Sequence, residues 1–316
     1  SLQATSRPPI HTHIVPHMYT VRMAKKPIYF VAWIAPSQTE LLLKVQKMKG
    51  VKCVAVGTSD LNASPDIANA LKTEQCPDIR TMVTQYDESP IWIAEPSAYD
   101  SSLCELLRSR TSTSITSTPL TGSLMELVDE AGKIPAAFYV PLLRRSNTHG
   151  ELLDNIEQFG LPKLLNITMT CAPDEGTLSA RLFDAMDFID NVIGTPDTVH
   201  AICDSDVVPE EACDLRGNMT VHLSFAGQRS ATLLLSDQTE WHRSVYAINK
   251  GHSLLIKDDA SFAALIHSTI STCSELSSGH THADAPRVLA LCEAARLSCL
   301  TGSPEHSSSI LGMLES

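Results

Sequence analysis

The chain has 316 residues, of which 43% are hydrophobic and 19% charged, and its acidic residues outnumber its basic ones by 36 to 24. This composition is typical of a globular protein with one large or two ordinary domains, and it excludes a disordered chain. The net charge of -12 argues against nonspecific binding to nucleic acid or to an anionic membrane. No apolar run approaches the roughly 20 residues that cross a bilayer.

Nine cysteines are spread along the chain without a C-x-x-C pair. An odd, unclustered set in apolar stretches indicates reduced thiols that serve as small core residues, not a disulfide framework. We therefore expect a cytoplasmic protein.

Residues 1–25 have no usable periodicity and are predicted to form a flexible tail. The tail contains three closely spaced histidines, which could bind a metal ion, although a tail without a metal is favoured. These histidines are His11, His13 and His17.

Strands and helices alternate over residues 26–143. The strands are continuous apolar runs, which indicates burial on both faces. This order predicts a domain with a parallel sheet and helices on both sides. The predicted strands are 27–35, 51–58, 89–96, 112–119 and 136–143. The predicted helices are 39–50, 65–74, 98–110 and 122–133.

A different pattern follows over residues 144–316. After a strand at 163–170, apolar residues recur at helical spacing from Leu178 to Ile193. Five segments with partial two-residue alternation and short turns then predict antiparallel hairpins, and a closing helix follows with Asp284 as its N-cap. We expect a second, α+β domain with an open, mostly antiparallel sheet. The five segments are 199–206, 219–227, 230–237, 242–249 and 252–259.

Four segments contain motif-like residue patterns in a fixed order. They are "IWIAEPSAYDSSLCELL" (91–107), "ITSTPLTGSLMELVDEA" (115–131), "RLFDAMDFIDNVIG" (181–194) and "LALCEAARLSCLTGSPE" (289–305). Together they resemble the Gfo/Idh/MocA family, named for glucose–fructose oxidoreductase and inositol dehydrogenase, over roughly residues 26–303. The resemblance implies an N-terminal Rossmann-type domain that binds NAD or NADP. It also implies a C-terminal sheet domain that holds a sugar-like substrate and often mediates oligomerisation.

The resemblance places the cofactor at the turn after the first strand, where the family has three glycines and this chain has Ala35, Ser37 and Glu40. A glycine-rich turn lets backbone amides approach a pyrophosphate at the helix N-terminus. Here Ser37 and Glu40 have the spacing of a capping box, which satisfies two of those amides internally. We therefore expect a turn that is closed to phosphate. The other cofactor positions that the resemblance implies are Gln38, Thr39, Thr58, Asp60 (alternatively a turn former), Pro96 and Ser117.

The resemblance also implies catalytic positions. Thr118 stands where the family has a lysine that contacts substrate and nicotinamide and assists proton transfer. Asp187 stands in place of the catalytic histidine, and Asp184 lies three residues away on the same helix face. Two close carboxylates can raise one pKa and act as a base, and the alternative is a solvated acidic face. Asp100, in place of another histidine, and Arg144 are candidate substrate contacts, and no metal site is predicted.

The glycines, the lysine and the histidine are absent together, which favours a non-catalytic or weakly active protein that binds a ligand or regulates a partner. The alternative is an active NAD(P)-dependent oxidoreductase on a sugar-like substrate, with Asp187 as its base. A third hypothesis is a structural role through the open face of the C-terminal sheet, which predicts a largely apolar outward surface around Leu234. We expect a homo-oligomer through that sheet, a small sugar-like ligand, and NAD, NADP or no cofactor. We expect no nucleic acid or membrane as a partner.

Overall fold

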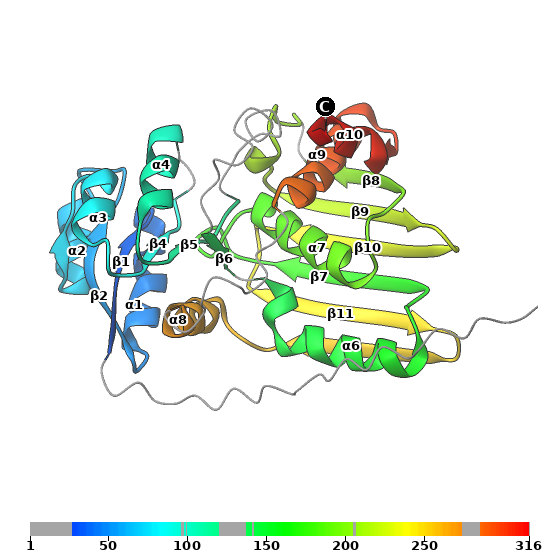
Figure 1. The fold of residues 1–316 in the computed structure, drawn as a ribbon, viewed down its shortest axis with the longest axis horizontal. Helices are drawn as coiled ribbons and strands as arrows, with labels where there is room; N and C mark the ends of the chain where they lie inside the picture. The colour runs from blue at the N-terminus through cyan, green and yellow to red at the C-terminus, as the bar shows by residue number, and fades with distance from the viewer. Residues whose placement is uncertain are drawn as a thin grey trace, which may run out of the picture.

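The computed structural model describes residues 27–95, 98, 100–119, 137–140, 142–204, 207–273 and 285–315. They form two sheets, each with helices packed against it (Figure 1). The predicted fold class is confirmed: a parallel, Rossmann-type sheet is followed by an α+β part with a mixed, mostly antiparallel sheet. The exact boundary at residues 143 and 144 stays a prediction.

The first sheet has six parallel strands in the spatial order β3-β2-β1-β4-β5-β6. The chain order reverses between β1 and β4, and in sheets of this kind ligands bind in the crevice beyond the carboxyl ends of the strands at that point. The strands are β1 (Ile28–Trp33), β2 (Val51–Gly57), β3 (Glu74–Gln75), β4 (Ile91–Ile93), β5 (Ser114–Thr116) and β6 (Ala137–Tyr139).

Helices cover both faces of the first sheet and fill two separate hydrophobic clusters. Along β1, Phe30 and Ala32 belong to one cluster, and Val31 and Trp33 belong to the other, because successive side chains of a strand point to opposite faces. The helices that follow these strands in the chain are α1 (Thr39–Lys47), α2 (Ser64–Leu71), α3 (Ile79–Gln85) and α4 (Ser101–Ser109).

One further helix on the first sheet comes from the far end of the chain. α8 (Phe262–Thr272) packs against α1, β1 and β2, and its buried side chains Phe262, Ile266 and Ile270 share a cluster with Phe30. Figure 1 shows α8 beside α1, between the two sheets. The second half of the chain thus completes the core of the first sheet.

The second sheet has seven strands in the spatial order β12-β11-β7-β10-β9-β8-β13. β7 and β10 run parallel, and the other described pairs are antiparallel. The strands are β7 (Leu164–Thr170), β8 (Thr198–Cys203), β9 (Asn218–Phe225), β10 (Arg229–Ser236), β11 (His242–Asn249), β12 (His252–Asp258) and β13 (Glu305–His306).

Helices cover one face of the second sheet. Leu233 and Leu235 of β10 point to this face and share a buried cluster with side chains of the helix that begins at Leu178. The elements of this part are η3 (Leu143–Arg145), α6 (Asn147–Phe159), α7 (Leu178–Val192), η4 (Ala212–Asp214), α9 (Ala285–Thr301) and α10 (Ser307–Glu315).

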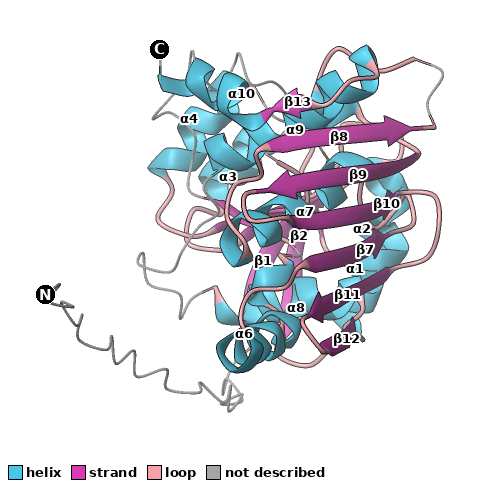
Figure 2. Ribbon diagram, turned by 90° about the vertical axis from the view of Figure 1, so that its right-hand side faces the viewer, coloured by secondary structure: helices cyan, strands magenta, loops and turns pink. Residues whose placement is uncertain are grey.

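The opposite face of the second sheet lies toward the viewer in Figure 2. The surface around Leu234 contains apolar and polar side chains, and a largely apolar surface there stays a prediction. Leu234 is 45% exposed, but its cross-strand neighbours on the same face are Thr220 and Thr168, and Ser230 and Thr232 precede it along β10. Threonine has a high preference for strands without requiring apolar burial, so the strand pattern does not reveal the chemistry of the outer face.

The sequence predicts most strands but misses four helices: α3, α6, α8 and α10. The predicted tail, the helix at 122–133 and the N-cap at Asp284 lie outside the described residues. All nine cysteines are free, and six of them are buried, as expected of small core residues. No helix in the described part of the chain is long and apolar enough to cross a membrane.

We expect Phe262→Ala to lower the free energy of unfolding by about 3–5 kcal/mol, because it deletes a fully buried aromatic ring and leaves a cavity. Urea unfolding followed by circular dichroism measures the change. Leu255→Ala is the control, since Leu255 is 57% exposed and its truncation should stay within about 0.5 kcal/mol. A loss below about 1 kcal/mol for Phe262→Ala would mean that α8 does not depend on this core.

Candidate functional site

The turn after β1 is closed by Gln38. Its Oε1 accepts a hydrogen bond from the Ala35 amide at 2.9 Å, and its Nε2 donates to the Asp174 carbonyl at 3.4 Å. Asp174 lies in the loop that leads into α7. The turn is therefore occupied by a side chain of its own that also contacts the second domain.

The predicted capping box of Ser37 and Glu40 is wrong. The first helical turn is η1 (Pro36–Gln38), with Ala35 as its N-cap and Gln38 as the third residue. Pro36 takes the first helical position, for which its fixed φ is well suited, so capping begins two residues earlier than the Ser-x-x-Glu spacing suggests. Thr39 closes the end of η1, where its hydroxyl donates to the Pro36 carbonyl at 2.7 Å.

The candidate ribose position, after β2, is also satisfied locally. Thr58 is fully buried, and its hydroxyl accepts from the Asp60 amide at 3.3 Å. Asp60 in turn accepts from the Asn62 amide at 3.0 Å, so Asp60 forms its own turn. Pro96 lies outside the described residues.

The residues after β5 face the second domain. Ser117 accepts a hydrogen bond from the Trp92 indole at 2.7 Å, so its hydroxyl serves the core of the first sheet. Thr118 is buried, and its hydroxyl has no hydrogen-bond partner within the described part of the chain. Both residues line a small cavity whose far wall includes Arg181 and Asp184 of α7.

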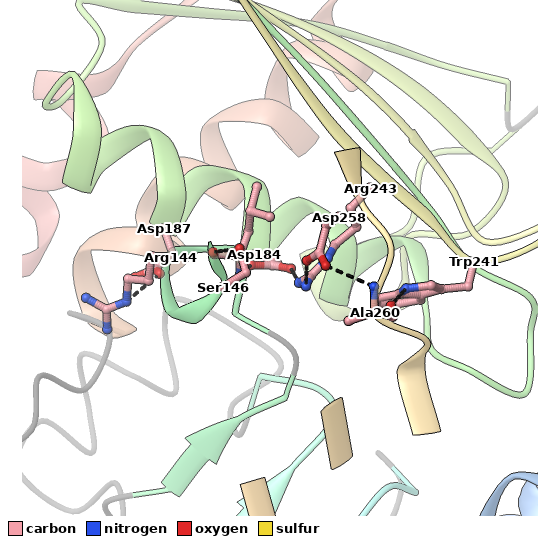
Figure 3. A network of polar contacts seen from close by, with 9 residues as sticks. Arg144, Ser146, Asp184, Asp187, Trp241, Arg243, Asp258 and Ala260 are labelled. Atoms are coloured by element: carbon pink, nitrogen blue, oxygen red, sulfur yellow. Dashed lines mark hydrogen bonds and ion pairs between the residues drawn. The ribbon is translucent and has the colours of Figure 1, made fainter. Parts of the chain in front are cut away.

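Asp184 is the centre of a buried network (Figure 3). One of its oxygens accepts from the Leu143 amide at 2.6 Å, and the other lies 3.4 Å from Nη1 of Arg243. Arg243 also pairs with Asp258 and lies over the ring of Trp241 at 5.3 Å. Burial raises the pKa of Asp184, and the two arginines nearby oppose this rise. The alternative of a solvated acidic face is wrong for Asp184, because 2% of it is exposed.

Asp187 and Arg144 are brought together as an ion pair. Oδ2 of Asp187 lies 2.8 Å from Nε of Arg144, and the two side chains are 4% and 10% exposed. The N–H does not align for a hydrogen bond to that oxygen, so the contact is mainly electrostatic. Burial raises the pKa of Asp187 to about 7, although Arg144 opposes this. Asp187, the candidate base, and Arg144, the candidate substrate contact, are therefore paired with each other.

Asp100 is not part of this site. It caps α4 by accepting from the Leu103 amide at 2.8 Å and pairs with Arg80 of α3. The Leu103 amide and Arg80 lower the pKa of the Asp100 carboxyl. This residue thus stabilises a helix terminus on the first domain.

Among the described residues, a cluster of two carboxylates and a thiol could hold a cation. The ligand atoms of Glu211, Cys213 and Asp214 lie within 4.8 Å of one another. These three residues belong to or adjoin η4 and include no predicted site residue. The sequence does not single out Arg181, Trp241, Arg243 or Asp258 either. An arginine within the apolar run of α7 is the one signal that a buried charge lies there.

The fold of this chain is similar to those of several solved structures. Myo-inositol 2-dehydrogenase from Lactobacillus plantarum matches with a TM-score of 0.66 and 15% identity, over 89% of this chain and 99% of that one. Scyllo-inositol dehydrogenase from Lactobacillus casei, solved with NAD(H) and scyllo-inositol, has a TM-score of 0.68 and 13% identity over 90% and 100%. An oxidoreductase from Agrobacterium radiobacter, solved with NAD+, L-tartaric acid and magnesium, has a TM-score of 0.64 and 12% identity over 90% and 100%.

No protein-family model and no curated protein sequence matches the chain. At these identities the likeness establishes the fold. The chain has the fold of these inositol dehydrogenases, a parallel sheet followed by a mixed sheet.

Asp187 gives the stability a distinct pH dependence. Its folded pKa of about 7 lies above the ordinary value near 4, so the native state keeps a proton that the unfolded chain has released between these values. Stability should therefore fall by a few kcal/mol as the pH rises from about 4 to about 7.

Asp187→Asn should reduce this slope, because Asp184, whose pKa burial also raises, remains. Urea unfolding at several pH values measures the change. Asp154→Asn is the control, because Asp154 is exposed on α6 and its loss should leave the slope in place. The same slope in Asp187→Asn as in the parent protein would contradict the assignment.

Proposed function

We propose that this chain is a non-catalytic or weakly active ligand-binding or regulatory protein, built on the fold of an NAD-dependent inositol dehydrogenase. The observation that carries the proposal is the side chain of Gln38, which occupies the turn where the fold's cofactor phosphates would bind. The ligand we expect is small and sugar-like, and the free cysteines support a cytoplasmic location.

The residues of the first turn do not fit a dinucleotide. A bound pyrophosphate needs free amides at the start of the helix, and here Gln38 already satisfies the Ala35 amide. The contact of Gln38 with Asp174 joins the two domains across the same region. Binding of the phosphates would therefore break two hydrogen bonds before it gained any.

The candidate catalytic residues support the same proposal. Thr118 replaces a lysine, and a hydroxyl cannot act as a proton donor of comparable acidity near pH 7. Asp187 is held by Arg144, so its carboxylate is not available to a substrate hydroxyl without a rearrangement of that pair.

The alternative is an active NAD(P)-dependent oxidoreductase with Asp187 as base. Its support is the pKa of Asp187, which burial raises to about 7, since a general base works best when its pKa lies near the working pH. This function requires Arg144 to move and the Gln38 turn to open.

The outer face of the second sheet supports a homo-oligomer. It carries a groove of about 680 Å³ whose thirteen lining residues include one charged side chain, Asp204. In a chain with a net charge of -12, a second copy can approach closely only where like charges are sparse. Leu234 and Ile202, 45% and 61% exposed, supply apolar contacts within the groove.

Titration of the purified protein with NADH and NADPH tests the proposed function. A ligand at about 100 times its Kd adds roughly 2.7 kcal/mol to the stability of a native state that alone binds it. We expect no change in thermal stability or nicotinamide fluorescence at millimolar cofactor. Gln38→Ala frees the Ala35 amide, so binding that appears in this variant alone would identify Gln38 as the block. Micromolar binding to the parent protein would establish the alternative instead.

Leu234→Arg should shift the protein toward the monomer, because it places a buried charge at the centre of the proposed interface. Sedimentation velocity measures the change. Leu61→Arg is the matched control, since Leu61 is 63% exposed on the first domain and should leave the assembly intact. A parent protein that sediments as a monomer would contradict the proposed interface.

A further inference from the structure

Arg181 is a buried cation without a hydrogen-bonded partner in the described part of the chain. Its side chain lies in the first turn of α7 and is completely buried. Nε and Nη1 of its guanidinium have no hydrogen-bond partner, and none of the ion pairs in the described ranges includes it. Buried charges in folded proteins are almost always paired. Arg181 therefore needs an acceptor that the surrounding side chains do not supply.

The neighbouring carboxylates are already engaged. Arg243 pairs with both Asp184 and Asp258, and the second oxygen of Asp184 accepts the Leu143 amide. The charges of Asp184 and Glu175 also act on Arg181, but neither carboxylate forms an ion pair or a hydrogen bond with it in the described part of the chain.

Trp241 fixes the position of the Arg181 charge. Cζ of Arg181 lies 4.7 Å from the centroid of the indole ring, which is a cation–π distance. Nε and Nη1 of Arg181 have no hydrogen-bond partner among the described residues, so these N–H groups are available to a ligand.

A cavity lies beside this guanidinium, between the two domains. Its lining includes Arg181 from α7 and Thr118 from the residues after β5, and the buried Thr118 hydroxyl is the second donor there without a partner. The cavity has a volume of about 10 Å³, which is room for one atom-sized group. Two residues with unsatisfied donors, one after β5 and one on α7, therefore line the same small cavity, together with Asp184.

We propose that Arg181 and Thr118 form a subsite for one oxygen of a carboxylate, and that the ligand of this cleft is a small organic acid. A carboxylate supplies a counter-ion as well as acceptor oxygens, and hydrogen bonds between charged groups are roughly twice as strong as neutral ones. A water molecule or a neutral hydroxyl would satisfy the donors but would leave the charge without its counter-ion. This assignment rests on the ligand-binding role proposed above and names its class of ligand.

Formate and formamide test the proposal, because they have nearly the same size and differ in charge. Thermal unfolding is measured with each compound up to about 0.1 M, a concentration that suits a Kd in the millimolar range. Sodium sulfate keeps the ionic strength constant. We expect formate to raise the Tm in a saturable way and formamide to leave it unchanged. Arg181→Met keeps the length of the side chain and should abolish the formate effect. Arg80→Met removes an exposed arginine of α3 and should retain it.

Arg181→Met removes an unpaired buried charge, so without formate its Tm should equal or exceed that of the parent protein. If this variant does not fold, Thr118→Val provides the test, with an expected rise of at least threefold in the Kd for formate. A formate effect that is lost in these variants supports the subsite.

Equal effects of formate and formamide, a formate effect that survives Arg181→Met, or no effect in the parent protein would each overturn it. The cofactor titration is independent of these results. If formate has no effect, only the proposal of an organic acid as ligand is overturned. A failure of NADH to bind would then still support the loss of hydride-transfer chemistry.

Discussion

The buried carboxylate of Asp184 is the contact that joins α7, β11 and the start of η3. It accepts the amide of Leu143, where the chain leaves the first domain, and pairs with Arg243 of β11. A carboxylate removed from water is tolerated only when hydrogen bonds and an opposite charge replace its hydration. Asp184 and its two partners come from three separate parts of the chain, so α7, β11 and the start of η3 are fixed together.

The site follows from this contact. Asp184 holds the Leu143 amide, so the backbone position of the next residue, Arg144, in η3 is fixed. Its guanidinium meets Asp187, which lies one helical turn beyond Asp184 on the same face. Asp184 therefore sets the position of Arg144, which is the partner of Asp187. The candidate base, Asp187, is neutralised by Arg144 as a consequence of this arrangement.

The sequence predicts those features that depend on local pattern. Buried strands such as β1 and β4 appear as continuous apolar runs, and β9 to β12 appear through two-residue alternation. The sequence places Asp184 and Asp187 on one helix face. The partners of Asp184, Leu143 and Arg243, and the partner of Asp187, Arg144, are distant along the chain and cannot be inferred from spacing. The Ser-x-x-Glu spacing places the cap of the turn after β1 two residues too late, because Pro36 determines where the helix begins.

On the proposed assignment, the cation of the cavity beside Thr118 differs in kind and in position from the one that the resemblance implies. The resemblance implies a lysine at the position of Thr118, whereas here the cation that lines the same cavity is Arg181, on the opposite wall. A lysine can both bind a substrate and exchange a proton, but a guanidinium remains protonated under all conditions in which proteins fold. Arg181 is therefore suited to hold an acid and unsuited to transfer a proton. On the proposed assignment, the loss of hydride-transfer chemistry and the retention of a charged ligand subsite are two consequences of the same exchange.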